Sequence, residues 1–211
     1  MNAAADIFCI DAFTLADLAE EILPLIPVSY AEAYKKNIAK RQTALEKLAA
    51  GYLLYRVLGV SGEDRLMRNV YGKPYLKERP GEAPRYFSLS DDEGIAVLAA
   101  ADFEIGADVH RIGITDARLM RKMLPEIEYA AFLAASPEEK SLLFAETWTA
   151  LEAKVKCLGT GFACNFRQHP EMLKELCTQT VQISEKYVVS CAARNEFTIR
   201  MIPLNALLSN G

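Results

Sequence analysis

The sequence lacks the features that mark membrane, secreted and nucleic-acid-binding proteins. No apolar run approaches the roughly 18–20 residues that cross a bilayer. The first residues, Met-Asn-Ala-Ala-Ala-Asp, contain no basic start before an apolar stretch, so we expect no secretory signal. The net charge of −4 provides no basic excess for nucleic acid. We therefore expect a cytoplasmic protein whose partners are neither membranes nor nucleic acids.

Cysteine and histidine are also too few, or too poorly spaced, for common structural sites. The cysteine count is odd and no Cys-x-x-Cys spacing occurs among Cys9, Cys157, Cys164, Cys177 and Cys191. We therefore expect neither a disulfide framework nor a structural zinc site, and a reducing cytoplasm fits best. The two histidines, His110 and His169, leave little room for histidine-based metal chemistry.

The composition itself is that of a folded domain. Hydrophobic residues make up 51% of the 211 residues and charged residues 25%, which allows one large domain or two small ones. The first half predicts a strand, a short helix capped by Thr14, a single long helix, a loop and three further strands. The first strand is predicted at residues 7–13, the short helix at 14–23 and the long helix at 30–58, where Gly59 ends it. The loop covers residues 61–85. The three further strands lie at 86–90, 94–101 and 104–110, with a turn at 91–94 between the first two.

The second half repeats this organisation. Helical patterns follow Thr115 and Pro125, and Ser136 with Glu139 forms a capping box for a helix that ends before Gly159. Strands are predicted at residues 181–184, 186–192 and 197–202. We expect an α+β fold of two similar lobes, 1–102 and 103–211, each with a long helix packed on a small antiparallel sheet. Together they form one compact unit with a site between them, as is common for ligand sites.

The first candidate site segment is the strand that contains Asp108 and His110. Residues two apart on a strand share a face, so these two project together while Ala107 and Val109 face the core. A carboxylate on a rigid strand suits a hard divalent cation. A half-exposed strand edge with two solvated polar residues explains the same pattern.

The second segment is helical. Trp148, Glu152 and Lys156 lie four residues apart on one stripe, where Glu152 can bind a cation and Lys156 a phosphate. An ordinary surface Glu–Lys pair is the alternative, since such pairs are weak and frequent.

The third segment is basic. Cations gather on the predicted long helix at Lys35, Lys36, Lys40, Arg41 and Lys47, and Lys73 follows in a Gly-Lys-Pro loop. A local cationic patch in an acidic chain can collect a polyanion. The solvated face of an amphipathic helix gives the same pattern.

The order of these segments resembles that of the 4′-phosphopantetheinyl transferase superfamily, of the two-lobed type. The motifs are Gly72-Lys73-Pro74, Phe87-Ser88-Leu89-Ser90, Gly106-Ala107-Asp108 and Trp148-Thr149-x-x-Glu152-x-x-x-Lys156-x-x-Gly159-x-Gly161. Each motif is weak alone, but four in order give a fairly specific signal. The resemblance covers most of the chain and implies two α+β lobes related by a pseudo-twofold.

The resemblance also implies a reaction. The 4′-phosphopantetheine group of coenzyme A would pass to a serine of an acyl or peptidyl carrier protein, with Mg²⁺ bound. Asp108 and Glu152 would be the catalytic and metal-binding carboxylates, with His110 as a poorer third ligand. Lys156, Lys73, Ser90 and Lys47 would hold coenzyme A. Fatty-acid, polyketide and peptide synthesis all use such carriers, and we expect a monomer to be sufficient.

The sequence departs from the family pattern at three positions. Asp91, His110 and Leu151 stand where the family has His, Glu and Lys. Two readings therefore remain: an active, divergent transferase, or a non-catalytic member that binds coenzyme A or a carrier protein. A third, an unrelated α+β binding protein, predicts that Asp108 and Glu152 lie too far apart to share a metal.

Overall fold

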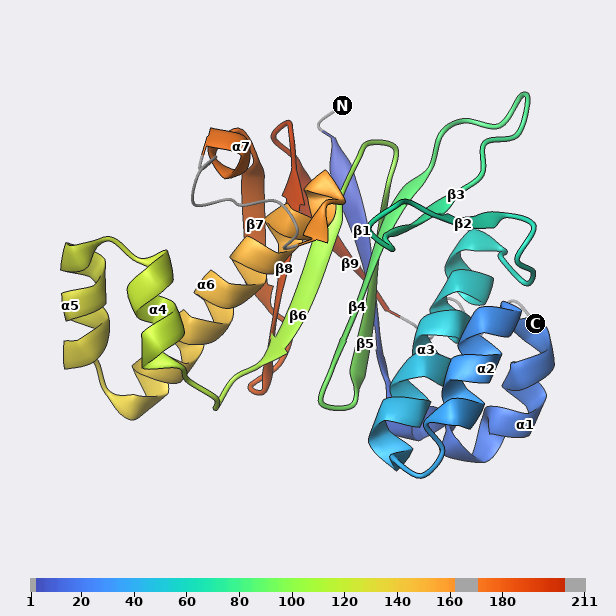
Figure 1. Cartoon of the computed structure of the whole chain (residues 1–211), viewed down its shortest axis with the longest axis horizontal. Helices are drawn as coiled ribbons and strands as arrows, with labels where there is room; N and C mark the ends of the chain where they lie inside the picture. Colours follow the sequence, from blue (N-terminus) through green and yellow to red (C-terminus); the bar gives the residue numbers. More distant parts are fainter. Residues whose placement is uncertain (1–2, 162–170, 204–211) are drawn as a thin grey trace.

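The computed structural model describes residues 3–161 and 171–203, so Cys164 and His169 lie outside it. Helices of the first half, two sheets and a long helix of the second half form four successive layers (Figure 1). Within the described ranges, no helix is both long and apolar enough to cross a bilayer. The four cysteines in these ranges, Cys9, Cys157, Cys177 and Cys191, are free thiols.

The chain begins with strand β1 (Ala4–Asp11), followed by short helical turns: η1 (Ala12–Leu18), α1 (Ala19–Ile22) and η2 (Leu23–Leu25). Thr14 was expected to cap the first turn, but Asp11 does so. The Asp11 carboxylate accepts a hydrogen bond from the backbone N–H of Phe13, and the hydroxyl of Thr14 donates to the Asp11 carbonyl. A carboxylate is the stronger acceptor for an unpaired helical N–H, so the cap lies three residues earlier than predicted.

The single long helix predicted over residues 30–58 is wrong. The structure contains two helices, α2 (Val28–Lys36) and α3 (Arg41–Leu58), separated by a turn. Asn37 is the C-cap of α2, and both its backbone N–H and its side-chain amide donate to the Ala33 carbonyl. Lys35 and Lys36 lie in the last turn of α2, where cations are favoured. The predicted end of α3 is confirmed, since Gly59 is its left-handed C-cap.

Sheet A has the strand order β4-β5-β1-β9 and contains β4 (Tyr86–Asp92), β5 (Ile95–Ala101) and β9 (Thr198–Ile202). The turn between β4 and β5 is tighter than predicted, because β4 continues through Asp92. Glu93 and Gly94 both have positive φ, as a two-residue hairpin turn requires. Strand β9 comes from the second half of the chain and pairs parallel with β1. A small hairpin, β2 (Leu66–Arg68) and β3 (Pro74–Leu76), lies in the predicted loop.

The second half contributes sheet C, with the order β6-β8-β7: β6 (Gly106–Arg111), β8 (Tyr187–Ala193) and β7 (Cys177–Gln182). Its helices are α4 (Ala117–Met123), α5 (Glu126–Ala134), α6 (Pro137–Leu158) and α7 (Glu171–Lys174). The predicted capping box at the start of α6 is confirmed, with Ser136 and Glu139 each accepting from the other's backbone N–H.

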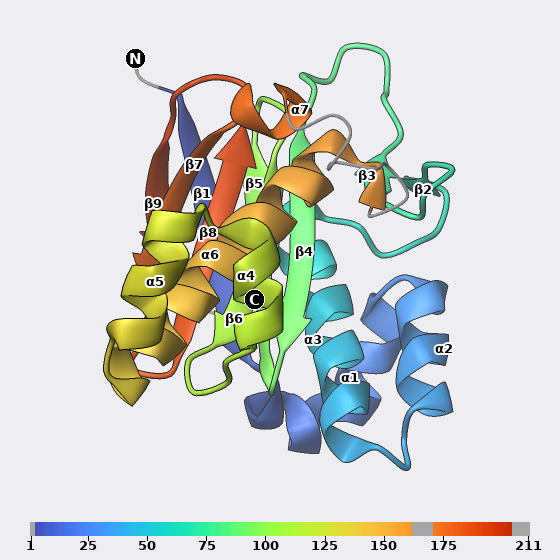
Figure 2. The ribbon, with the colours of Figure 1, turned by 60° about the vertical axis from the view of Figure 1, so that its left-hand side comes forward.

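Sheets A and C pack face to face around apolar side chains from both. Alternate residues of β5 point to opposite sides: Val97 and Ala99 meet sheet C, while Leu98 packs against α3. A strand buried on both faces must be apolar throughout, as β5 is. Helix α6 crosses the outer face of β6 and β8 (Figure 2).

The edge strands β4 and β6 are joined by side chains rather than by a backbone ladder. Alternate side chains of β4 accept hydrogen bonds from the backbone N–H groups that β6 directs toward β4. Ala107 N donates to Ser88 Oγ (2.9 Å), Val109 N to Ser90 Oγ (3.3 Å) and Arg111 N to Asp92 Oδ2 (2.8 Å). A buried edge with unpaired N–H groups is costly, so this side-chain ladder fixes how the sheets meet.

Replacing Ser88 by Ala tests the ladder. The variant leaves the buried N–H of Ala107 without its acceptor, and we expect the free energy of unfolding to fall by about 1–3 kcal/mol in urea denaturation. Ser141→Ala is the control. Ser141 is also buried, but its hydroxyl donates to a carbonyl of its own helix, so the expected loss is below about 1 kcal/mol. Equal losses in the two variants would contradict the ladder.

Candidate functional site

A cavity of about 420 Å³ opens between β4, β6 and α6, and we call it the β4–β6 pocket. It contains five of the residues predicted from the sequence: Ser90, Asp108, His110, Glu152 and Lys156. The expected sidedness is confirmed on both elements. Asp108 and His110 line the pocket, and Ala107 and Val109 belong to the core, with Val109 also bordering the pocket. Trp148, Glu152 and Lys156 share one face of α6.

Three of these side chains form a connected polar group. Lys156 Nζ lies 2.7 Å from Asp108 Oδ1 and 2.9 Å from Ser90 Oγ. Ser90 donates its hydroxyl hydrogen to the same Asp108 oxygen at 2.7 Å. Asp108 is buried, so its charge is stabilised by the ammonium and the hydroxyl instead of by water. The carboxylate is therefore held in one orientation on a rigid strand.

Glu152 lies close enough to Asp108 for the two carboxyl groups to interact electrostatically. Burial raises the pKa of the Glu152 carboxyl, the negative charge of Asp108 raises it further, and Lys156 lowers it in part. Two carboxylates that repel each other across a small pocket are a common arrangement at functional sites. The hypothesis of an unrelated α+β binding protein predicted that Asp108 and Glu152 lie too far apart to share a metal. The two carboxylates line the same pocket, which contradicts that hypothesis.

The donor set of this pocket fits a magnesium ion. Asp108 and Glu152 would supply oxygen ligands, and a divalent cation would offset the burial and the repulsion from Asp108 that together raise the pKa of Glu152. Among the described residues no cluster of three or more Asp, Glu, His or Cys side chains is arranged to enclose a metal. Magnesium commonly takes one or two carboxylates and completes its shell with water and substrate phosphates. Two carboxylates are therefore sufficient.

His110 is paired in a way that the sequence did not indicate. Its Nδ1 lies 3.1 Å from Asp92 Oδ2, and this hydrogen bond raises the pKa of the imidazole. Burial raises the pKa of Asp92, but the bonds from His110 and the backbone of Arg111 outweigh it and lower that pKa overall. The ring of His110 also packs against Phe144, with 5.7 Å between ring centroids. The alternation of Ser88, Ser90 and Asp92 on a buried strand was the available signal for these contacts.

Lys47 reaches the pocket only through Asp91. Its ammonium lies 2.8 and 2.9 Å from the two carboxylate oxygens of Asp91, which itself lines the pocket. Lys47 is not among the lining residues, and its charge is engaged by the ion pair with Asp91. The lining of the β4–β6 pocket contains four carboxylate side chains and two basic side chains, Lys156 and His110.

A second and larger cavity, of about 770 Å³, lies beneath the β2–β3 hairpin, and we call it the hairpin pocket. It adjoins the β4–β6 pocket along two elements. On β4, Tyr86 and Phe87 line the hairpin pocket and Leu89 and Ser90 line the β4–β6 pocket. At the end of α6, Lys156 lines the β4–β6 pocket and the next residues, 157–159, line the hairpin pocket. The two pockets thus follow one another between β4 and α6.

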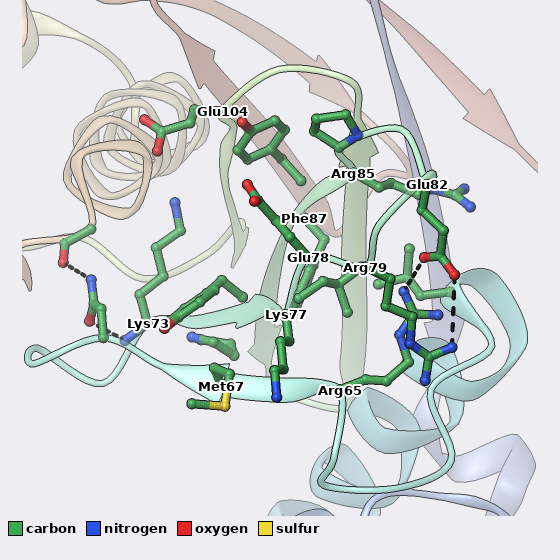
Figure 3. Close-up of a pocket in the computed structure, with 18 of the residues that line it drawn as sticks. Arg65, Met67, Lys73, Lys77, Glu78, Arg79, Glu82, Arg85, Phe87 and Glu104 are labelled. Atoms are coloured by element: carbon green, nitrogen blue, oxygen red, sulfur yellow. Dashed lines mark hydrogen bonds and ion pairs between the residues drawn. The ribbon is translucent and has the colours of Figure 1, made fainter.

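The cations of the hairpin pocket differ in how far they are engaged. Arg65 and Arg79 gather around Glu82 at one end (Figure 3). Lys77 and Arg85 make no ion pair with any residue in the described ranges and are exposed. They are the cations most available to an anionic ligand.

Lys73, the remaining predicted residue, lies at the opposite end of the hairpin pocket (Figure 3). Its ammonium is 3.2 Å from the carbonyl oxygens of both Ile105 and Cys157. Burial lowers the pKa of Lys73. The structure therefore separates Lys73 from the group formed by Ser90, Asp108 and Lys156.

Comparison with known proteins agrees with this arrangement. Residues 104–199, which contain Asp108, Glu152 and Lys156, match the model of the 4′-phosphopantetheinyl transferase superfamily. The chain is 28% identical over 159 residues to the 4′-phosphopantetheinyl transferase pptA of Paxillus involutus, covering 63% of this chain and 59% of the relative. It is 29% identical over 140 residues to the 4′-phosphopantetheinyl transferase HetI of a Nostoc species, covering 64% and 56%.

The aligned parts span less than two thirds of each relative's length. The family match nevertheless falls on the strand and helix that supply the pocket carboxylates and Lys156. The α+β architecture, with antiparallel pairing throughout sheet C and a long helix on each half, agrees with it. Over residues 104–199 the chain is therefore similar to the 4′-phosphopantetheinyl transferase superfamily, and it is similar to two 4′-phosphopantetheinyl transferases over 159 and 140 residues.

Proposed function

We propose that the protein transfers the 4′-phosphopantetheine group of coenzyme A to a serine of an acyl or peptidyl carrier protein, with Mg²⁺ bound. The observation that carries this proposal is the group of Ser90, Asp108 and Lys156, which joins β4 of the first half to β6 and α6 of the second beside Glu152. It sets a cation-binding carboxylate and a phosphate-binding ammonium side by side, as phosphoryl transfer requires.

In this proposal Asp108 and Glu152 hold the magnesium ion. When bound, the ion supplies positive charge that neutralises the diphosphate and orients the leaving group. Lys156 contacts a phosphate oxygen, and Ser90 keeps Asp108 oriented through its 2.7 Å hydrogen bond. The cation is needed because the pocket lining is acidic and would otherwise repel a diphosphate.

The nucleotide portion of coenzyme A occupies the hairpin pocket. Its volume of about 770 Å³ is in the range of sites for ligands of this size. Tyr75 and Tyr86 offer ring faces, and Lys77 and Arg85 offer unpaired positive charge. The diphosphate would then lie where the two pockets adjoin, next to Lys156.

The reaction breaks one phosphorus–oxygen bond and forms another. The carrier serine oxygen attacks the phosphorus that bears the pantetheine arm, and the adenosine bisphosphate leaves. Glu152 accepts the serine proton, directly or through a water, because the other carboxylates that line the pocket are engaged by Lys47, His110 or Lys156. One chain supplies the whole site, so a monomer is sufficient.

A transfer assay tests the proposal directly. With coenzyme A, Mg²⁺ and a panel of apo carrier proteins, at least one carrier should gain the mass of a phosphopantetheine group by mass spectrometry. Asp108→Ala should lower the rate at least about a hundredfold, because the cation loses a rigid ligand. Asp6→Asn is the control: it removes an acid from a remote ion pair with Arg200 and should leave the rate unchanged. Binding of coenzyme A without an adduct on any carrier would instead favour a non-catalytic member.

Asp91 is expected to weaken coenzyme A binding by engaging Lys47. Asp91→Asn or Asp91→His should lower the dissociation constant about fivefold, because one freed cation near a phosphate contributes roughly 1 kcal/mol. The gain should shrink at high salt and vanish in a Lys47→Met background. Calorimetry at two salt concentrations measures it, and an unchanged affinity would remove Asp91 as a restraint on Lys47.

Glu152 is expected to cost stability in the absence of a cation. The pKa of Glu152 is raised in the folded state, so the charged carboxylate destabilises the fold at a pH above that pKa. At a pH well below it, Glu152 is protonated in both the folded and the unfolded protein, and the effect disappears. Glu152→Gln should raise the free energy of unfolding at pH 7 by less than about 1 kcal/mol, and the gain should disappear below about pH 4. Adding Mg²⁺ should raise the melting temperature of the parent more than that of the variant. A variant less stable at pH 7 would contradict the assignment.

A further inference from the structure

The loop between β2 and β3 is held rigid by the side chain of Asn69. Its Oδ1 accepts hydrogen bonds from the backbone N–H groups of Tyr71 and Lys73, both at 2.9 Å. The backbone closes the same loop, because Asn69 N donates to the carbonyl of Lys73 and Gly72 N donates to that of Asn69. Gly72 has a φ of 89°, which a side-chain-bearing residue rarely adopts. The loop is therefore a fixed platform.

This platform is attached to the C-terminal end of α6. Asn69 Nδ2 donates to the carbonyl of Gly159, the left-handed C-cap of α6, at 2.7 Å. Lys73 Nζ donates to the carbonyl of Cys157 in the last turn and to that of Ile105, just before β6. These three bonds, from two side chains of the first half of the chain, join the ends of α6 and β6. We call Asn69 and Lys73 the clamp.

The clamp meets a physical need of the helix. The last four carbonyls of a helix have no partner within it, and the end carries partial negative charge that favours a cation. The fit is also close: a Cβ atom on Gly159 would lie 3.1 Å from Asn69 Nδ2 and 3.2 Å from Lys73 Cδ. The absence of a side chain at Gly159 thus admits the clamp.

The two elements that the clamp joins carry the groups that meet in the β4–β6 pocket. Lys156 precedes Cys157, and Asp108 lies three residues after Ile105. Between them β6 and α6 are in close contact, since a Cβ on Gly106 would lie 2.0 Å from the carbonyl oxygen of Ala153. A shift of the end of α6 would therefore move Lys156 relative to Asp108, across a bond of 2.7 Å.

We propose that Asn69 and Lys73 are positioning residues, which set the end of α6 against β6 so that Lys156 and Asp108 meet in register for transfer. The inference rests on the proposed transferase function. It gives Lys73 a different role from the contact with coenzyme A that the family resemblance implies, because two of its three N–H groups are used by main-chain carbonyls.

Two variants and a matched control test the clamp. Asn69→Asp keeps the acceptor that holds the loop but replaces the donor to Gly159, and Lys73→Met removes the ammonium with little change in shape. Asn37→Asp is the control, because the Asn37 amide also donates to a carbonyl near a helix end, that of Ala33 in α2, far from either pocket. Hydrogen exchange, calorimetric binding of coenzyme A and steady-state transfer are measured for all three.

Both clamp variants should speed backbone hydrogen exchange at residues 155–160 about tenfold and leave residues 55–59 of α3 unchanged. They should lower kcat at least about tenfold while the dissociation constant of coenzyme A stays within about twofold, because misplacement affects the reacting groups more than binding. Asn37→Asp should change exchange only in α2 and leave kcat as in the parent.

Two results would overturn the inference. Unchanged exchange at residues 155–160 in both variants would mean that the clamp does not hold α6. A dissociation constant raised tenfold by Lys73→Met, with kcat retained, would make Lys73 a ligand of coenzyme A. Failure of the proposed function is a separate result: a parent that transfers nothing refutes the transferase, while the exchange measurement still decides whether the clamp holds α6.

Discussion

The structure depends on how two sheet edges meet without a backbone ladder between them. Strand β4 closes one sheet and β6 closes the other, and the side chains of Ser88, Ser90 and Asp92 accept the N–H groups that β6 directs outward. Side chains at alternate positions match the alternation of outward N–H groups on an edge strand. This contact satisfies a buried edge and also brings Ser90 to Asp108, so the same residues join the halves and begin the site.

Helix α6 completes the site from the other side. It is attached to sheet C by the close approach of Gly106 to Ala153, and to the first half by Asn69 and Lys73. Lys156 then lies between these attachments and meets Asp108 and Ser90. The proposed transfer would require Lys156 to be held to within a fraction of an ångström, and these attachments come from segments far apart in the sequence.

Two of the three departures from the pattern of the similar transferases have charged partners in the structure. Asp91, which replaces a histidine, binds Lys47, and His110, which replaces an acid, binds Asp92. Each substituted charge is therefore balanced by a neighbour on another element, with Lys47 on α3 and Asp92 on β4. Residues 88–92 serve three purposes at once: they join the sheets, orient Asp108 and pair the unusual side chains.

Elements whose signals are local could be predicted from the amino-acid sequence. The capping box at Ser136, the glycine ends of α3 and α6, and the shared faces of Asp108 with His110 and of Glu152 with Lys156 follow from periodicity and capping chemistry. Tertiary structure decided what depends on distant partners. Asn37 divides the predicted long helix, β9 pairs with β1 across nearly the whole chain, and Lys73 binds the end of α6. A side chain's partners depend on which segments the fold brings together, and no spacing within one segment records that.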